Sequence, residues 1–303
     1  MRLIEATDAQ QLERDALTWQ AWGAGLTAEQ FVKREKRLRE HVWSRRTMKS
    51  FWWVDECGAP LSSCELFLDD AYVGERRGKA GIVASVFTEE KLRGKGHAAA
   101  MLSALTDRVR ERDDVLALTL FSEIGVDLYQ RVGFYAVPSF DSFFTPLSER
   151  PASVHLVERE LPIPRDETTE PTTLRQVLTP ARLDWHLERE RIYGEVMAKP
   201  RLPFHGAVFG DASITFTAYW KTNELQVLTL DARTAADATQ LIDAARHAAH
   251  LLGLPTVRVW ETEAFTGVLP GGERRARTDE IPMFLPIAPG IEAWTHVERA
   301  LWA

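Results

Sequence analysis

A short glycine-rich stretch, Arg93 to Ala98, has the composition of a loop that binds an anion. It follows an apolar run from Gly81 to Thr88 that predicts a buried strand, and it precedes an alanine- and leucine-rich helical pattern. Small residues at Gly94, Gly96 and Ala98 let the backbone come close to a ligand. The first amides of the helix have no partner inside it, so they attract an anion, most naturally a pyrophosphate.

Two better-known phosphate loops do not fit this stretch. The chain has no Gly-x-x-x-x-Gly-Lys-Ser/Thr, and Gly94 and Gly96 are followed at position 99 by alanine with no acidic ribose-binding residue at the expected strand end. What remains is Arg93-x-x-Gly96-x-Ala98 behind a strand. On these residues alone, a solvated strand-to-helix turn stays an alternative interpretation.

A second motif lies downstream, after another predicted buried strand from Leu116 to Phe121. It reads Leu-Tyr-x-x-x-Gly-Phe and runs from Leu128 to Phe134. In this order, with a helix and a strand between them, the two motifs resemble the signatures of the GNAT N-acetyltransferases. The resemblance implies an α/β (α+β) chain with a mixed, mostly antiparallel and splayed sheet. It also implies acetyl-CoA as cosubstrate, CoA as product and a primary amine as acceptor.

The same resemblance implies roles for individual residues. Val86 and Thr88 would offer backbone groups to the pantetheine arm, and the amide near Val86 would polarise the thioester carbonyl. Ser122 stands where many relatives have Asn, and the resemblance implies that it contacts the pantetheine. The residues expected to hold the pyrophosphate are Arg93, Gly94, Lys95, Gly96, His97 and Ala98.

Tyr129 is the residue expected to give a proton to the leaving thiolate, because the resemblance places it beside the sulfur. A phenol titrates near pH 10 and a thiol near 8.5, so donation is uphill by about 2 kcal/mol, which the site could close by tuning. Core packing before a Gly-Phe turn is the alternative role for this tyrosine.

Glu65 is the best candidate for the general base. Deprotonating a lysine-like amine at neutral pH costs roughly 4.6 kcal/mol, so an acidic group or a water chain must assist. The strand before the glycine loop contains no carboxylate, whereas Glu65 is expected in the middle of the adjacent strand. An ordinary salt bridge is the alternative role. Glu123 is a weaker candidate, and Asp69 and Asp70 are expected in a loop.

A narrower resemblance concerns the acceptor. Leu26 to Phe31 with Arg34-Glu35, Leu61 to Glu65, and Ser122 to Gly125 ahead of Tyr129 are similar to the fungal lysine N6-acetyltransferases. The resemblance implies that free L-lysine becomes N6-acetyl-L-lysine, the first step of lysine degradation. A cationic residue of the second domain, for which Arg258 and Arg274 are possible, would pair with the lysine carboxylate.

Alternative functions stay open at this point. The acceptor could be another small amine, a protein lysine or a protein N-terminus, all of which would use the same first domain. The chain could also be a module that senses acetyl-CoA without turnover.

Composition excludes several other classes. The 303 residues carry a net charge of −7, which disfavours nucleic acid as a partner. No apolar run is long enough to span a bilayer and Met1 to Glu5 lack the apolar centre of a signal peptide, so a cytoplasmic location without membrane contact is expected. Cys57 and Cys64, expected in neighbouring strands, predict free thiols rather than a metal site. The oligomeric state stays open.

The elements that position these residues follow from periodicity and turn signals. In the first half we expect helices at 8–22 and 28–43 and an antiparallel set of strands at 51–54, 61–68 and 81–88. The second half predicts helix at 174–196, a hairpin at 213–220 and 225–230, helix at 235–252 and strand at 256–260.

The expected division of the chain is a GNAT acetyl-CoA-binding domain at 1–147, a linker at 148–172 and a GNAT-like domain at 173–303 that caps the substrate site. The strand, strand, helix, strand order of the last part repeats that of the first, but the turn from Asp231 to Ala236 has no glycine. This second half is therefore expected to lack a cofactor loop. The tail from Ile281 is expected to pack back onto the first domain.

Overall fold

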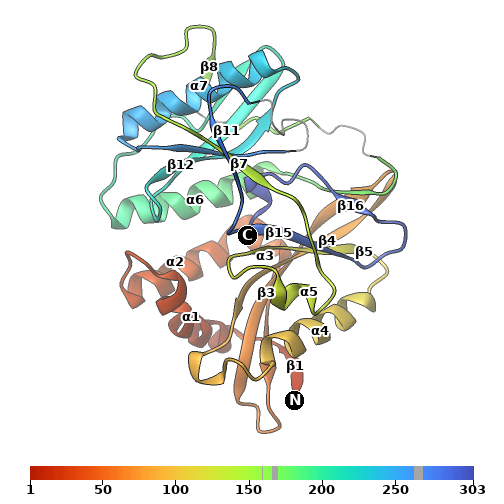
Figure 1. Cartoon of the computed structure of the whole chain (residues 1–303). Coiled ribbons are helices and arrows are strands. Elements are labelled where there is room, and N and C mark those ends of the chain that lie inside the picture. The colour runs from red at the N-terminus through yellow and green to blue at the C-terminus, as the bar shows by residue number, and fades with distance from the viewer. Residues whose placement is uncertain (159, 166–169, 263–268) are drawn as a thin grey trace.

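Two β-sheets with helices on their faces make up the protein, which a computed structural model describes over residues 1–158, 160–165, 170–262 and 269–303 (Figure 1). The helices are α1 (Asp8–Trp22), α2 (Ala28–Glu40), α3 (Val42–Thr47), α4 (His97–Arg110), α5 (Asp127–Gln130), α6 (Pro180–Val196) and α7 (Ala235–Leu252), with 3-10 turns η1 (Glu90–Leu92) and η3 (Arg299–Leu301). The predicted α/β class is confirmed.

The first sheet has the strand order β1-β2-β3-β4-β5-β15-β6, with β9 paired to β3 and β16 paired to β9. Its strands are β1 (Arg2–Glu5), β2 (Met48–Val54), β3 (Pro60–Val73), β4 (Arg76–Phe87), β5 (Val115–Ser122), β6 (Tyr135–Ala136), β9 (Thr173–Gln176), β15 (Ile281–Pro286) and β16 (Ala293–Trp294). As predicted, β2, β3 and β4 are antiparallel neighbours.

The central strands β4 and β5 are parallel and separate part of the way along. Their pairing ends at Ile82 and Thr119, although β4 continues to Phe87 and β5 to Ser122. The backbone of residues 83–87 on that side therefore has no strand partner among the described residues. This is the splay that the resemblance implied.

Helix α4 packs one apolar face on the first sheet, as its three- and four-residue spacing predicts. Met101, Leu102, Leu105 and Val109 are buried in one cluster with residues of β3, β4 and β5. The start of α4 is thereby fixed relative to the ends of the splayed strands.

The second sheet has the strand order β14-β7-β13-β12-β11-β10-β8. Its strands are β7 (Phe140–Phe144), β8 (His155–Val157), β10 (Gly206–Phe209), β11 (Ala212–Tyr219), β12 (Glu224–Asp231), β13 (Val257–Trp260) and β14 (Glu273–Ala276). Alternation in β11 and β12 decides what each face covers: Ile214 and Phe216 join the cluster of α7, whereas Leu228 joins Leu183 and Leu187 of α6.

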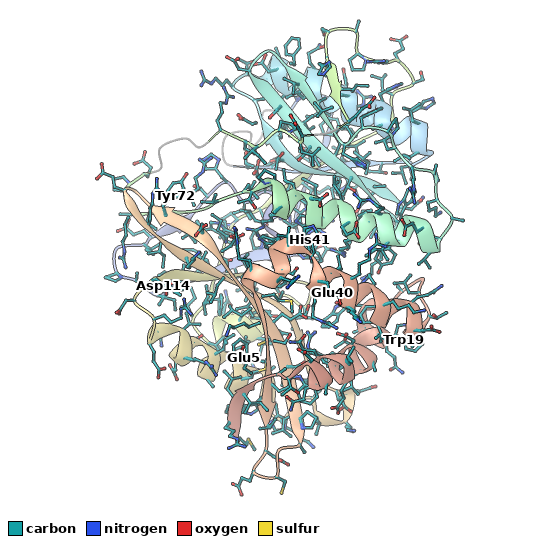
Figure 2. All side chains as sticks on the ribbon, turned by 180° about the vertical axis from the view of Figure 1, so that it is seen from behind. Glu5, Trp19, Glu40, His41, Tyr72 and Asp114 are labelled. Carbon is teal, nitrogen blue, oxygen red and sulfur yellow. The ribbon has the colours of Figure 1, made fainter. Side chains whose placement is uncertain are left out.

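Helix α6 lies between the second sheet and the N-terminal helices (Figure 1). Its Trp185 packs in one cluster with Leu38 of α2 and Trp43 of α3. His41 lies at the break between those two helices (Figure 2). Its Nε2 is 3.0 Å from a carboxylate oxygen of Asp184 on α6. The two halves of the chain thus share a core.

The predicted helix at 28–43 is interrupted at His41. This residue has extended backbone angles (φ −61°, ψ 143°), and its ring accepts a hydrogen bond from the amide of Trp43, so it ends α2 and caps α3.

Three other local predictions are wrong. Leu174 to Gln176 form strand β9 instead of the start of a helix, because they pair with the edge of β3. Asp69 and Asp70 lie inside β3. Cys57 lies in a turn, while Cys64 is buried in β3, and both are free thiols as predicted.

The two sheets exchange strands along the chain. Strand β7 comes from the first half but pairs with β13 in the second sheet, and β9 and β15 come from the second half but pair with β3 and β5. The predicted return of Ile281 to Phe284 onto the first domain is confirmed by the pairing of β15 with β5. Strand β8 falls inside the segment 148–172. The division of the chain at 147 and 172 stays a prediction.

Candidate active site

The loop between β4 and α4 has the conformation that its glycines predict. Gly94 and Gly96 have φ of 75° and 80°, and a Cβ added to either would meet no protein atom within 4 Å. Arg93 folds back on the loop, since its Nε donates to the carbonyl of Thr88 at 3.0 Å. Both glycines therefore border open space in a backbone conformation that side chains disfavour.

Helix α4 begins without a side-chain cap. Its N-cap residue is Gly96, whereas threonine side chains cap α1, α2, α6 and α7. The amides of His97 and Ala98 are thus left for an outside acceptor, and the helix dipole adds positive potential there. The loop fits a pyrophosphate.

A cavity of about 730 Å³ connects this loop with the rest of the candidate site. The lining residues from the first half include Arg14, Arg34, Glu35, Glu65, Val86, Thr88, Arg93, Gly94, Gly96, His97, Ala98, Glu123 and Tyr129. The second half contributes Trp185, Arg189, Tyr219, Lys221, Trp302 and Ala303. The cavity is therefore built by both halves of the chain.

Two of the predicted cofactor residues do not line this cavity. Lys95 is exposed on the loop. Ser122 is fully buried and its hydroxyl donates to the carbonyl of Gly125 and accepts from the amide of Ile124 at 3.3 Å. Thr88 lies near Ser62, with the two hydroxyl oxygens 2.9 Å apart.

Tyr129 lines the cavity from α5 and is 6% exposed. Its ring packs edge-on against Phe134, with 6.2 Å between the ring centroids, so the core-packing role and access to the cavity coexist. Burial, followed by the nearby Cys64 and Glu123, raises the pKa of the phenol to about 12. Tyr129 is consequently neutral over the whole physiological pH range.

Glu65 also lines the cavity, but it is held in a buried ion pair. Its carboxylate accepts from Arg14 Nη1 at 2.7 Å, and both side chains are less than a tenth exposed. The ion-pair alternative for Glu65 is therefore present in the structure together with access to the cavity.

Arg14 is a residue of the site that sequence reasoning missed. Besides Glu65, its guanidinium donates to Ser63 Oγ at 3.1 Å and to the carbonyl of Ser85 at 2.7 Å. Ser85 has φ of +49° and lies in a β-bulge where β4 has one more residue than β3. Arg14 thus holds the bulge immediately before Val86. The only sequence signal would have been a single arginine in α1.

Among the described residues, no group of His, Cys, Asp and Glu side chains could hold a metal ion, and no helix has the length and apolarity needed to cross a membrane.

Two family models match parts of the chain. Residues 13–134 match the Acetyltransferase (GNAT) family, and residues 155–301 match the LYC1 GNAT-like C-terminal domain. A search of curated proteins finds no match.

Solved structures show the same fold. A conserved protein of unknown function from Enterococcus faecalis V583 has a TM-score of 0.61 at 12% identity, covering 94% of this chain and 72% of its own. A GCN5-related N-acetyltransferase from Kribbella flavida has a TM-score of 0.52 at 17% identity, covering 93% and 70%. Eis1 from Mycobacterium abscessus has a TM-score of 0.54 at 13% identity, covering 95% and 74%.

Proposed function

We propose that this chain, a GNAT-type N-acetyltransferase, transfers the acetyl group of acetyl-CoA to the side-chain amine of free L-lysine. The observation that carries the proposal is a cavity lined by both halves of the chain, together with the match of the second half to the LYC1 GNAT-like C-terminal domain. The resemblance of the first half to fungal lysine N6-acetyltransferases supports the same acceptor. Residues 173–303 would then cap the amino-acid end of the substrate.

The glycine loop would hold the pyrophosphate through the uncapped amides at the start of α4. Arg93, Gly94, Gly96, His97 and Ala98 line the cavity and so fit this role. The splayed end of β4 would pair with the pantetheine arm through residues 86–88, with the Val86 amide near the thioester carbonyl.

The reaction requires three proton movements, two from the nitrogen and one to the sulfur. After the lysine ammonium has lost one proton to become a neutral amine, its nitrogen bonds to the acetyl carbon and loses a second proton, while the sulfur, whose bond to that carbon breaks, gains one. We assign the donor role to Tyr129. With a pKa of about 12, donation to an ordinary thiolate is uphill by about 5 kcal/mol. A thiolate in the same low-dielectric site is also destabilised, and the buried thiol of Cys64 illustrates this because burial raises its pKa to about 12. The difference in pKa between the phenol and the leaving thiol, and with it the cost of proton donation, is therefore smaller in the site.

Glu65 remains the proposed acceptor of the amine proton, directly or through water. The Arg14 contact fixes the orientation of its carboxylate, which is a requirement for a general base. Glu35 and Glu123 also line the cavity, and Glu35 is already ion-paired with Arg34.

A cytoplasmic location is part of the proposal, since both described cysteines are free thiols, as expected in a reducing compartment.

The acceptor is tested by following CoA release with a thiol reagent while acetyl-CoA is offered with free amines. The panel contains L-lysine, L-ornithine, 1,5-diaminopentane and a lysine-containing peptide. We expect L-lysine to give the highest kcat/KM, with N6-acetyl-L-lysine as the product by mass spectrometry. A peptide that reacts while lysine does not would replace the proposal with a protein acetyltransferase. CoA binding without release from any amine would favour a sensor.

Replacing Gly96 by alanine should weaken CoA binding about 5- to 30-fold, because the free loop would relax out of the left-handed conformation, and restoring that conformation for binding costs a residue with a Cβ about 1–2 kcal/mol. The Cβ would also enter the open space beside the loop. Calorimetric titration with CoA measures the change. The matched control is Gly253→Ala at the end of α7, where φ is 68° and a Cβ would likewise meet nothing within 4 Å. That variant should lose stability but bind CoA like the wild type. Equal CoA affinity in both variants would contradict the role of the loop.

A further inference from the structure

The wall that the second half contributes to the cavity carries positive charge. Arg189 lies on α6, and Tyr219 and Lys221 lie at the turn that joins β11 to β12. Arg189 lines the cavity and is 8% exposed, so most of the side chain is covered by protein. A buried cation of this kind is expected to have an anionic partner.

The protein gives Arg189 mainly uncharged partners. Its Nη2 donates to the phenol oxygen of Tyr219 at 2.9 Å, and its guanidinium stacks 4.2 Å from the ring of Trp302. The nearest carboxylate is that of Glu190, 3.7 Å from Arg189 Nε, and its other oxygen accepts from the amide of Trp220. Glu190 does not line the cavity.

Among the described residues, the second half contributes no aspartate or glutamate side chain to the cavity lining. The lining contains three glutamates, all from the first half of the chain: Glu65 pairs with Arg14, Glu35 pairs with Arg34, and Glu123 directly follows β5. His186 lies one helical turn before Arg189 on α6. Burial lowers the pKa of its imidazole, and the positive charges of Arg299, Arg182 and Arg189 lower this pKa further. This surrounding is therefore favourable to an anion.

The arginines that the sequence suggested for this role are occupied elsewhere. Arg258 donates to Asp141 at 2.6 Å and to Glu280 at 2.9 Å, and Arg274 donates to Glu261 at 2.8 Å. Neither residue lines the cavity.

We propose that Arg189, with Tyr219 beside it and Lys221 at the same wall, binds the carboxylate of the acceptor amino acid. This inference rests on the proposed function, because it concerns the end of the substrate that does not react. A guanidinium presents two parallel N–H groups to a carboxylate, which gives direction as well as affinity. An amine without a carboxylate would leave Arg189 unpaired, so this residue would select amino acids over simple diamines.

The experiment compares L-lysine with 1,5-diaminopentane, which has the same reacting amine but no carboxylate. We expect the wild type to prefer lysine in kcat/KM, and we expect Arg189→Gln to lower the ratio of the two values about 10- to 100-fold, mainly through KM for lysine. Arg191→Gln on the same helix is the matched control. Arg191 pairs with Glu188 outside the cavity lining, and Glu188 keeps Arg37 as a second partner.

Each outcome has a defined meaning. A ratio that falls in Arg189→Gln but not in Arg191→Gln supports the proposal, and one that stays at the wild-type value in both overturns it while leaving lysine as the substrate. Equal kcat/KM values of the wild type for 1,5-diaminopentane and L-lysine would overturn both the inference and the choice of lysine. If Arg189→Gln does not fold, Arg189→Lys decides. The lysine keeps the positive charge but lacks the paired N–H groups, so the ratio of kcat/KM for L-lysine to kcat/KM for 1,5-diaminopentane should lie between the wild-type value and one. An unchanged ratio overturns the proposal.

Discussion

Tyr129→Phe is expected to lower kcat for acetyl transfer about 10²- to 10⁴-fold, the range over which a positioned proton donor contributes. The change removes only the hydroxyl, and the edge-on packing of the ring against Phe134 is retained. CoA affinity and the thermal unfolding midpoint should therefore remain close to those of the wild type. Stopped-flow or steady-state kinetics at saturating acetyl-CoA measure the change in kcat.

Tyr135→Phe is the control for this substitution, because Tyr135 on β6 is 62% exposed and outside the cavity lining. It should leave kcat unchanged. A Tyr129→Phe enzyme as fast as the wild type would show that the phenol serves packing alone, and the donor would then have to be water.

The pKa of Tyr129 adds a dependence on pH. Burial raises the pKa to about 12 in the folded protein, against about 10 in an unfolded chain. The folded state therefore keeps a proton that the unfolded state releases between those values. The stability due to this group is complete below pH 10 and decreases as the pH rises through the window. An alkaline limb of kcat near pH 10 that disappears in Tyr129→Phe would contradict the burial of the phenol.

Arg14→Met is expected to destabilise the protein by about 3–5 kcal/mol, because it leaves the carboxylate of Glu65 buried without a counterion. It also removes the donor to the carbonyl of Ser85, so the β-bulge before Val86 is less fixed. Urea unfolding measures the stability, and acetyl transfer should be impaired in the fraction that folds.

The double variant Arg14→Met/Glu65→Gln tests the cause. Removing the second charge should recover much of the stability, since the buried anion is gone. Arg112→Met provides the surface comparison: its partner Asp114 and Arg112 itself are each nearly half exposed, and the expected loss is below about 1 kcal/mol. If Arg14→Met costs no more than Arg112→Met, the buried ion pair does not stabilise the site.

Several elements could be predicted from the sequence because their signals are local, although the local break of the helix at His41 was missed. The capping boxes at Thr7 and Thr27 place the starts of α1 and α2, and the glycines at 94 and 96 predict the turn before α4. Alternation and turn residues placed both hairpins. In each case the residues that decide the structure are within a few positions of one another.

What the sequence could not show depends on contacts between distant residues. Arg14 is 51 positions from Glu65 and 71 from Ser85, and nothing in α1 distinguishes it from a surface arginine. Arg189 reaches the cavity only because α6 packs beside α2 and α3, which periodicity does not encode. For the same reason the sequence pattern predicted a helix at Leu174 to Gln176, whereas these residues form a strand because they pair with the edge of β3.

The exchange of strands between the sheets affects how the chain can acquire its structure during synthesis. The sheet that carries the glycine loop contains β15, so β5 has an open edge until the ribosome has passed residue 286. An unpaired edge of this kind is a template for association with other chains. The N-terminal regions of chains made of independent domains commonly fold early and alone, but here such folding would give an incomplete sheet. A gene fragment that ends before β15 would encode the glycine loop without the strand that pairs with β5 in the sheet carrying this loop.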